Sequence, residues 1–573
     1  MAHADILADV TLDAPWALVE RFSTFPRWKP EEVNASCDIM VDALKSWGVQ
    51  VTVHEPEIYL SVPYDARVKA GGRTIRAKPP AYAIDCRQGV TAPIVHVPAT
   101  YSRSIGSLFH KSQDADLSSA ERIRGKIVIS EGFAFPQKMR EFEEKGAIGV
   151  IAMNPGVDIH WGICTSIWGT PDLDDLPRKP KIAVVAVNNP DGKQLIAAAA
   201  EGKKGRVVTE MQEGWFKQKL PVVDIRGKAD PDRFVFVHGH LDSWDVGVGD
   251  NATGDATMLE MARVLWKNRD KLKRSVRIAW WPGHSTGRYA GSTWYADAYA
   301  LDFDANCVAQ IDCDSPGCRW ATSYHQTTTM SETEAHVMRA IKDITGIDGK
   351  PKRPNQAGDY SFNNIGISSY FMLSSTMPEG LRAEKGYYAV SGCGGNIAWH
   401  TENDTIEIAD KEILMTDIKI YLLSTLRNAN DDVLPYDWRA TAQEFGRTIE
   451  AYQKAAGAAF DLAPAKAALG SLSAALDKLY AGIASGKVKQ KAANEALMRL
   501  ARVLVPINFT REPRFRHDPA YTCPPLPTLA TASELATMPA RLVGFAKTQL
   551  MRGQNRFCAA MREAEGIVAQ AMA

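Results

Sequence analysis

The chain has 573 residues, and at ~100–200 residues per domain we expect about three or four domains. Lysine plus arginine equals aspartate plus glutamate, 67 of each, so no net charge favours nucleic acid or an anionic membrane. No apolar run approaches the ~18 residues of a membrane helix, and the start has no basic and apolar leader pattern. We therefore expect no membrane or nucleic-acid partner, a cytoplasmic location, and nine reduced, mostly buried cysteines.

The first part of the chain predicts two helices and a strand. Residues 12–29 are amphipathic, with Asp13 as a fair N-cap, and a second helix is expected over 30–47. Gly48 is placed to end that helix, and the alternating stretch VQVTVHEPEIYLSVP is typical of a strand.

The sequence pattern changes after about residue 88. Short β runs such as GKIVIS and KIAVVAV alternate with glycine and proline turns up to about residue 220, which predicts a separate β-rich insert. Within it, residues 160–180 form a loop with two tryptophans and a histidine, an unusual content for a loop. This loop either packs on its own domain or covers a site elsewhere in the molecule.

The central region predicts a strand–helix–strand unit of a parallel sheet. In this region we expect strands over 234–238, 276–281 and 307–312, and helices over 253–267, 291–300, 332–345 and 410–428. Long helical patterns dominate from Leu434 onward. We therefore assign 1–87 and 221–432 to one α/β domain, 88–220 to the insert, and 433–573 to a helical domain.

Polar side chains gather where the predicted strands end. His240, Asp250 and Asp314 follow strands, and His400 stands in the loop WHTENDT. Ligands bind beyond the carboxyl ends of strands in open α/β sheets, and metal sites collect histidine and carboxylate from several loops. Each residue alone is also compatible with a turn, a cap or the surface. Their shared placement predicts a metal site, with Asp242 as the group that orients His240.

Five motifs, in chain order, resemble those of the M28 metallopeptidases in the branch that has a protease-associated domain: HGHLDSW, GDNATG, WPGHSTG followed by GS, DCDS and WHTENDT. The resemblance covers nearly the whole chain. It implies a zinc-aminopeptidase-like mixed sheet flanked by helices. It also implies that the insert is like a protease-associated domain, and that the helical region is like the dimerisation domain of the transferrin receptor, so that the protein is a homodimer.

The same resemblance implies one or two divalent ions, with zinc as the expected metal. By the family pattern, His240 and Asp314 hold one metal, Asp250 bridges, and His400 serves the other metal. The family has Glu-Glu after the strand that ends here at Trp281, the first as general base and the second as ligand. This chain has His284-Ser285 instead. Serine is a poor zinc ligand, whereas histidine suits either an acid/base or a ligand role.

Trp399 stands where some relatives carry an oxyanion-stabilising tyrosine, so Tyr360, Arg288 and Tyr387 are candidates for that role. Arg288 is also a candidate to pair a substrate carboxylate bidentately, with a surface position as its alternative. Several tryptophans are expected either to pack ordinarily or to form an aromatic pocket for a small substrate: Trp161, Trp168, Trp244, Trp320 and Trp399.

These features favour a metal-dependent hydrolase of an amide or peptide bond, with His284 as acid/base and a rebuilt metal centre. The substrate would be a small molecule or short peptide, aromatic or carboxylate-bearing. One alternative is a metal-dependent lyase, in which the histidine abstracts a proton beside a carboxylate. Another is a receptor that has lost catalysis, although five retained polar groups argue against a dead site.

Overall fold

The computed structural model describes residues 3–102, 120–371 and 373–573. Its centre is a six-stranded sheet in the order β1-β9-β11-β10-β12-β15. The strands from β11 to β15 run parallel, and β1 and β9 add antiparallel partners at one edge. The bounds are β1 (Val51–His54), β9 (Leu220–Ile225), β10 (Asp230–His240), β11 (Arg274–Trp281), β12 (Cys307–Asp312) and β15 (Ser369–Tyr370).

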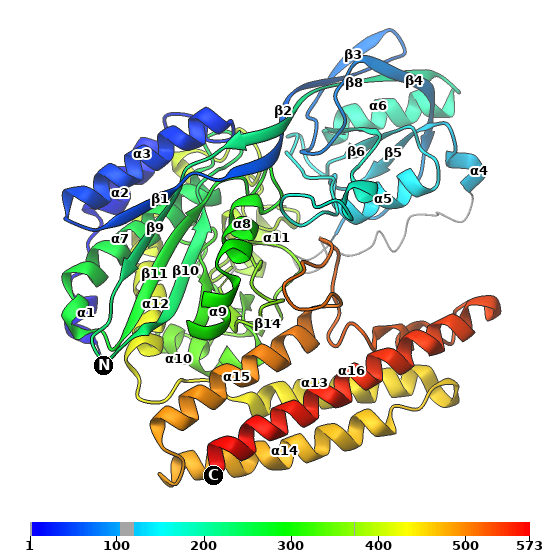
Figure 1. The fold of residues 1–573 in the computed structure, drawn as a ribbon. Coiled ribbons are helices and arrows are strands. Elements are labelled where there is room, and N and C mark those ends of the chain that lie inside the picture. The colour runs from blue at the N-terminus through cyan, green and yellow to red at the C-terminus, as the bar shows by residue number, and fades with distance from the viewer. Residues whose placement is uncertain (1–2, 103–119, 372) are drawn as a thin grey trace.

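Helices cover both faces of this sheet, as Figure 1 shows. The strands are buried on both faces, as expected for a parallel sheet between helices. The helices of this domain are α1 (Ala4–Leu7), α2 (Asp13–Phe22), α3 (Pro30–Ser46), α7 (Thr253–Lys267), α8 (Ala290–Ala298), α9 (Ala300–Asn306), α10 (Glu334–Thr345), α11 (Glu379–Glu384) and α12 (Lys411–Asn430). The mixed α/β class predicted from the sequence is confirmed, although α2 ends at Phe22, earlier than expected.

The insert is built on a second, seven-stranded sheet in the order β3-β2-β8-β4-β5-β6-β7. Its strands are β2 (Glu57–Ala70), β3 (Arg73–Ala77), β4 (Cys86–His96), β5 (Ile127–Glu131), β6 (Gly149–Met153), β7 (Ala183–Val187) and β8 (Lys204–Lys217), with helices α4 (Ala120–Ile123), α5 (Pro136–Glu144) and α6 (Asn189–Ala200). The sheet therefore begins at residue 57, whereas the sequence analysis placed the boundary at 88. The cause is non-local pairing: β2 runs antiparallel to β8 over most of its length.

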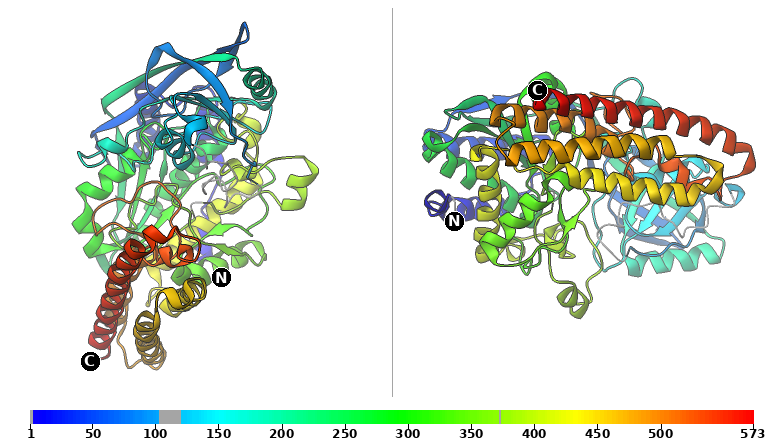
Figure 2. Two further views of the ribbon diagram at one scale, coloured as in Figure 1. Left: turned by 90° about the vertical axis from the view of Figure 1, so that its right-hand side faces the viewer. Right: turned by 90° about the horizontal axis from the view of Figure 1, so that it is seen from below.

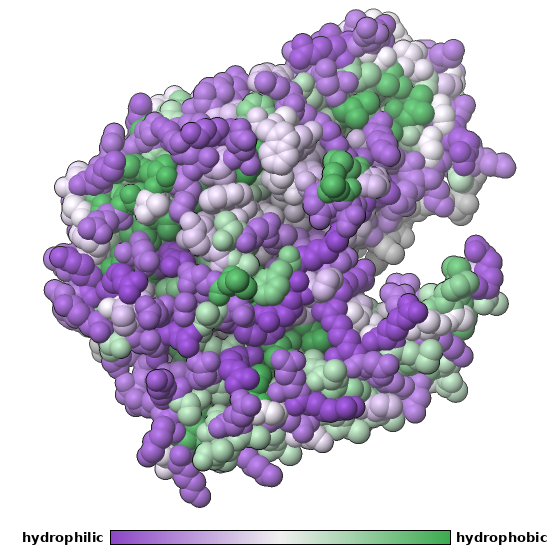
Figure 3. Space-filling model, viewed as in Figure 1, coloured by the Kyte–Doolittle hydropathy of each residue, from purple (hydrophilic) through white to green (hydrophobic). Residues whose placement is uncertain are grey.

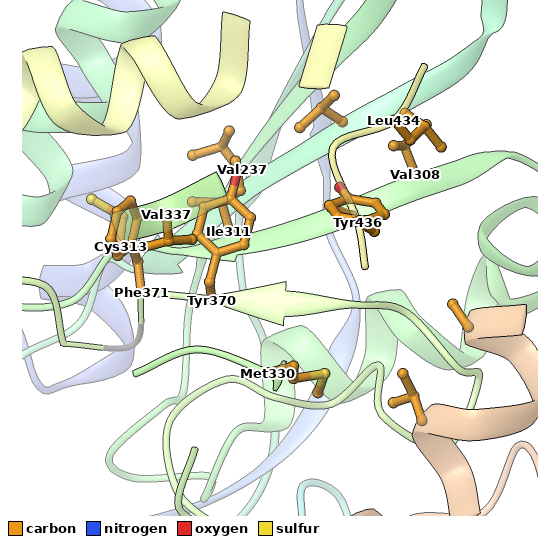
Figure 4. Packing of buried hydrophobic residues seen from close by; sticks show 14 of the residues in the cluster. Val237, Val308, Ile311, Cys313, Met330, Val337, Tyr370, Phe371, Leu434 and Tyr436 are labelled. Carbon is orange, nitrogen blue, oxygen red and sulfur yellow. The ribbon is translucent and has the colours of Figure 1, made fainter. Parts of the chain in front are cut away.

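The last part of the chain is helical. It contains α13 (Trp438–Ala456), α14 (Ala463–Ala484), α15 (Gln490–Phe509) and α16 (Ala540–Met572). Figure 2 shows these helices lying along one side of the molecule. They share one continuous hydrophobic core with the central domain, and Figure 4 shows Leu434 and Tyr436 at this junction beside Val308. The helical region is therefore packed onto the sheet domain and is not a tethered appendage.

Two further findings concern cysteines and membranes. All nine cysteines are free thiols, six of them buried, as the sequence analysis expected. Across the described residues, none of the helices combines the length and the apolar character needed to cross a bilayer.

A buried acid at the helical junction makes the stability of this region depend on pH. Glu332 is 2% exposed and accepts a hydrogen bond from Thr441 Oγ1 at 3.0 Å. Burial raises the pKa of Glu332 from 4.5 to about 7. Between these values the folded state keeps a proton that the unfolded state releases, so stability falls as pH rises through this window.

We expect wild type to lose on the order of 3 kcal/mol at this site between pH 4.5 and 7, and Glu332→Gln to lose much less, because glutamine does not ionise. Urea unfolding at both pH values measures the difference. Glu450→Gln, at a side chain that is 67% exposed, is the matched control. Parallel pH profiles of wild type and Glu332→Gln would contradict this assignment.

Candidate metal centre

The site forms where three neighbouring parallel strands end. His240 is the last residue of β10 and is level with Trp281, the last residue of β11. Asp314 follows two residues after the end of β12, and His284 follows three residues after Trp281. Because β10 lies between β11 and β12, these side chains converge at one edge of the sheet, as expected for a ligand site of this sheet type.

His240 is oriented by its own loop. Its Nδ1 donates to the backbone carbonyl of Asp242 at 2.6 Å, which leaves Nε2 free. Nε2 lies 3.0 Å from Asp250 Oδ1 and 3.7 Å from Asp314 Oδ2, yet this buried nitrogen makes no hydrogen bond. Burial lowers the pKa of His240, but the two carboxylates outweigh it and raise the pKa well above its ordinary value. The three groups together therefore favour a cation at Nε2.

Asp250 faces two histidines with its two oxygens. Oδ2 lies 3.3 Å from His400 Nε2, while Oδ1 faces His240. The loop is fixed from behind by Asp404, whose carboxylate accepts the backbone N–H of Gly249 at 2.7 Å and of Asp250 at 3.0 Å. Burial opposes ionisation of Asp250, but the histidines hold its pKa well below its ordinary value. Asp250 is thus an ionised carboxylate in a bridging position.

The insert reaches this site through the 160–180 loop. His400 Nδ1 donates to the carbonyl of Trp161 at 3.1 Å, and the Trp161 N–H donates to the His400 carbonyl at 2.8 Å. The His400 ring also stacks on Trp399 at 3.7 Å between centroids. Of the two alternatives left by the sequence, the loop therefore meets the site and orients one of its histidines.

Asp242 contacts both His240 and His284, but its side chain does not orient His240 as the sequence analysis expected. Its carboxylate accepts the backbone N–H of His284 and of Ser285, each at 2.9 Å, and only its carbonyl contacts His240. The side chain therefore shapes the loop after β11. Because the turn between His240 and Asp242 is tight, the backbone carbonyl of Asp242 reaches His240 Nδ1 and its carboxylate does not.

His284 has a partner that the sequence analysis did not identify. Its Nδ1 lies 2.7 Å from Asp359 Oδ2, and Ser292 Oγ donates to Asp359 Oδ1 at 2.5 Å. The ring stacks on His240, with centroids 3.8 Å apart and planes 17° apart. Burial raises the pKa of Asp359, but His284 lowers it by more, so the net shift is downward. The one signal available was GDYSF in a loop that leads into β15.

This donor set fits a divalent metal ion. Within the described part of the chain, ligand atoms of His240, His284 and Asp314 lie within 4.8 Å of one another. The unpaired Nε2 of His240 and the adjacent carboxylates are the nitrogen and oxygen donors that zinc accepts. The second position has Asp250 Oδ2 and His400, while Ser285 is buried where the family has its glutamate ligand. The residues present therefore fit a divalent metal ion at the His240 position.

Most of the remaining candidates are buried, whereas Tyr387 and Trp320 are partly exposed. Tyr360 is 3% exposed, and its hydroxyl donates to Thr328 Oγ1 at 3.4 Å. Arg288 is 4% exposed, which excludes the surface alternative. The backbone N–H of Tyr387 donates to the Arg382 carbonyl. Four of the five candidate tryptophans are at most 5% exposed, which agrees with ordinary packing: Trp161, Trp168, Trp244 and Trp399.

The comparisons with known proteins concern the central domain and the fold. Residues 222–424 match the model of peptidase family M28. The central domain belongs to this family. The structure of an aminopeptidase from Aneurinibacillus sp. strain AM-1 is similar, with a TM-score of 0.54, 19% identity, and coverage of 75% of this chain and 96% of that one. An M28 peptidase precursor from Shewanella amazonensis gives a TM-score of 0.56 at 17% identity, with coverage of 75% and 96%.

Curated relatives of the M28 domain differ in their named activities. A probable glutamate carboxypeptidase of Zea mays is 26% identical over 39% of this chain and 32% of its own length. Leucine aminopeptidase 2 of Arthroderma otae is 24% identical over 65% of this chain and 74% of its own. Transferrin receptor protein 1 of Gallus gallus is 32% identical over 24% and 21%. The chain thus spans about a third of the first of these relatives.

Removing a central donor tests the metal site. We expect His240→Ala to lose bound metal, because Asp250 and Asp314 would keep their charges without the nitrogen donor between them. Metal per chain is measured by elemental analysis after purification without chelator. His325→Ala, at an exposed position, is the control. Equal metal content in wild type and His240→Ala would contradict the placement.

Proposed function

We propose that this protein is a metal-dependent hydrolase that cleaves an amide or peptide bond of a small molecule or short peptide. The observation that carries the proposal is the convergence of His240, Asp250 and Asp314 beside His284, on a fold of the M28 type. Relatives named as aminopeptidases, and a neighbouring structure titled a zinc aminopeptidase, support this reaction class and this metal.

His240, Asp250 and Asp314 would hold a single zinc ion, with His400 contacting Asp250 from the far side. Bound there, the ion would supply Lewis acidity to the scissile carbonyl and to the attacking water. The proton transfers are carried out by a side chain. His284 Nε2 would take the proton of the attacking water and then deliver it to the leaving amine.

The surroundings of His284 support this acid/base role. The Asp359 carboxylate accepts the Nδ1 proton, so the basic lone pair is on Nε2. Ser292 fixes Asp359, and the Asp242 carboxylate fixes the backbone of His284. Each contact limits the motion of the imidazole, so the ring is held in one orientation before substrate arrives.

The role of His284 is tested by two substitutions. We expect His284→Ala to reduce kcat by about 10²- to 10⁴-fold while keeping its metal, since general acid–base catalysis contributes about this much. Asp359→Asn should also reduce kcat and alter the pH profile, because the tautomer of His284 is no longer fixed. Peptide turnover and metal content are measured on the same samples.

The matched control is Asp297→Asn, which disrupts another aspartate–histidine pair, with His517, at 2.9 Å. Loss of one metal equivalent in His284→Ala would make this residue a ligand and remove its acid/base role. Product analysis in ¹⁸O water separates hydrolysis from elimination, because only hydrolysis incorporates the label, whereas elimination leaves a new double bond.

The proposal includes a homodimer formed through the helical region. The first turns of α16 project beyond the rest of the bundle, and Figure 3 shows hydrophobic colour along this end. Phe545 is 76% exposed and Met551 is 53% exposed, so the start of α16 presents large apolar side chains to solvent.

We expect Phe545→Glu to shift the protein from dimer to monomer in analytical ultracentrifugation, because a carboxylate resists burial in an apolar interface. Leu301→Glu, at a residue that is 75% exposed on α9, is the control for a new surface charge. An unchanged dimer in Phe545→Glu would remove α16 from the interface.

A further inference from the structure

We propose that Arg288 binds a free carboxylate of the substrate, so that the enzyme acts on molecules with a carboxylate close to the bond that is cleaved. This inference rests on the proposed hydrolase function for its second experiment, but its first experiment is independent of catalysis.

Arg288 is a buried cation that pairs with no carboxylate of the described residues. It is 4% exposed, and its Nε is buried without a hydrogen bond. Within the described residues, the guanidinium forms no hydrogen bond and no ion pair. A buried unpaired charge is strongly unfavourable in a folded protein, so such a group is retained where something else pairs with it.

Other buried arginines of this chain show the contrast. Arg27 donates to four backbone carbonyls, and Arg274 to two. Arg502 donates to four carbonyls and lies 3.6 Å from Asp304. These three arginines are therefore hydrogen-bonded to backbone carbonyls within the chain, whereas Arg288 is not.

The guanidinium lies close to the metal centre. It sits over the ring of Tyr289 at 4.5 Å, and that ring packs edge-on against His284 at 4.9 Å. The neighbouring carboxylate, Asp359, is already engaged by His284 and Ser292 and does not pair with Arg288. One aromatic ring thus separates the guanidinium of Arg288 from the imidazole of the proposed acid/base.

The backbone at Arg288 adopts a strained conformation. Arg288 and Tyr289 have φ of 45° and 73°, in the left-handed region that non-glycine residues rarely adopt. The N–H of Gly169, from the insert, donates to the Arg288 carbonyl at 2.6 Å. A Cβ on Gly169 would come within 2.3 Å of Thr293, so only glycine allows this approach. Strain maintained by surrounding structure is typical of functional sites.

A carboxylate matches this position better than a more highly charged anion. Burial lowers the pKa of Arg288, while Tyr289 and Asp359 act in the opposite direction. Among the described residues, no second cation affects the pKa of Arg288. One guanidinium balances the single charge of a carboxylate, and its planar donors fit the two oxygens in a bidentate pair.

The first experiment measures binding alone. Succinate and its uncharged analogue succinamide are titrated calorimetrically into the full-length, zinc-loaded protein. We expect succinate to bind wild type and to bind Arg288→Gln about 10- to 100-fold more weakly, the range for a charged hydrogen bond. Arg288→Lys should be intermediate, and Arg447→Gln, at an exposed arginine, should match wild type.

Any contact of succinate with the metal is the same in wild type and Arg288→Gln, so their ratio isolates Arg288. Equal affinities, equal binding of succinamide, or no succinate binding to wild type at millimolar concentration would each overturn the proposal.

The second experiment identifies the source of the carboxylate. Turnover of Ala-Ala against Ala-Ala-amide reports a terminal carboxylate, and Ala-Glu against Ala-Gln reports a side-chain carboxylate. The preferred acid should lose its advantage in Arg288→Gln. If no peptide is cleaved, the hydrolase proposal fails, while the calorimetry still decides whether Arg288 binds a carboxylate.

A stability measurement excludes a merely structural role. Arg288→Met keeps most of the volume and removes the unpaired charge, so its melting temperature without ligand should equal or exceed that of wild type. A large decrease would show that Arg288 supports the fold, and would overturn the assignment of its charge to a ligand.

Discussion

The approach of two carboxylates to one buried imidazole nitrogen is the constraint on which the site depends. Asp250 and Asp314 approach His240 Nε2 from separate loops, and neither can neutralise the other. A cation between them satisfies all three groups at once, whereas without one the site retains repelling charges in a buried place. The parallel order of β10, β11 and β12 makes this convergence possible, because all three strands deliver their loops to the same edge.

Contacts from distant parts of the chain keep these loops in position. Arg27, from the N-terminal region, donates to carbonyls of the loop between His240 and Asp250. The insert supplies Trp161 to His400 and Gly169 to Arg288. The C-terminal region adds Ala520, which packs with Trp168 and Tyr289. The site is thus a property of all three parts of the chain and not of the central domain alone.

His284-Ser285 stands where the M28 pattern has Glu-Glu, and we propose that this exchange changes the chemistry of the site. Serine withdraws a ligand from the His400 side, and the bridging Asp250 remains. Histidine adds a nitrogen donor stacked on His240 and oriented by Asp359. An aspartate–histidine pair can move protons near neutral pH, a task for which a glutamate needs a raised pKa. The pair is therefore compatible with the proposed single metal and the proposed histidine acid/base.

The sequence by itself determined the elements and the strand-end residues. Strands with apolar runs, α7 at Thr253–Lys267 and β12 at Cys307–Asp312 follow from local periodicity, and the polar residues after them mark the ligand edge. Only the tertiary structure decided the early start of the insert, the pairing of His284 with Asp359 and the isolation of Arg288. The pairing of β2 with β8 and of His284 with Asp359 joins residues that are 75 or more positions apart, for which no local pattern carries a signal. The surroundings of Arg288 likewise include Gly169 of the distant insert.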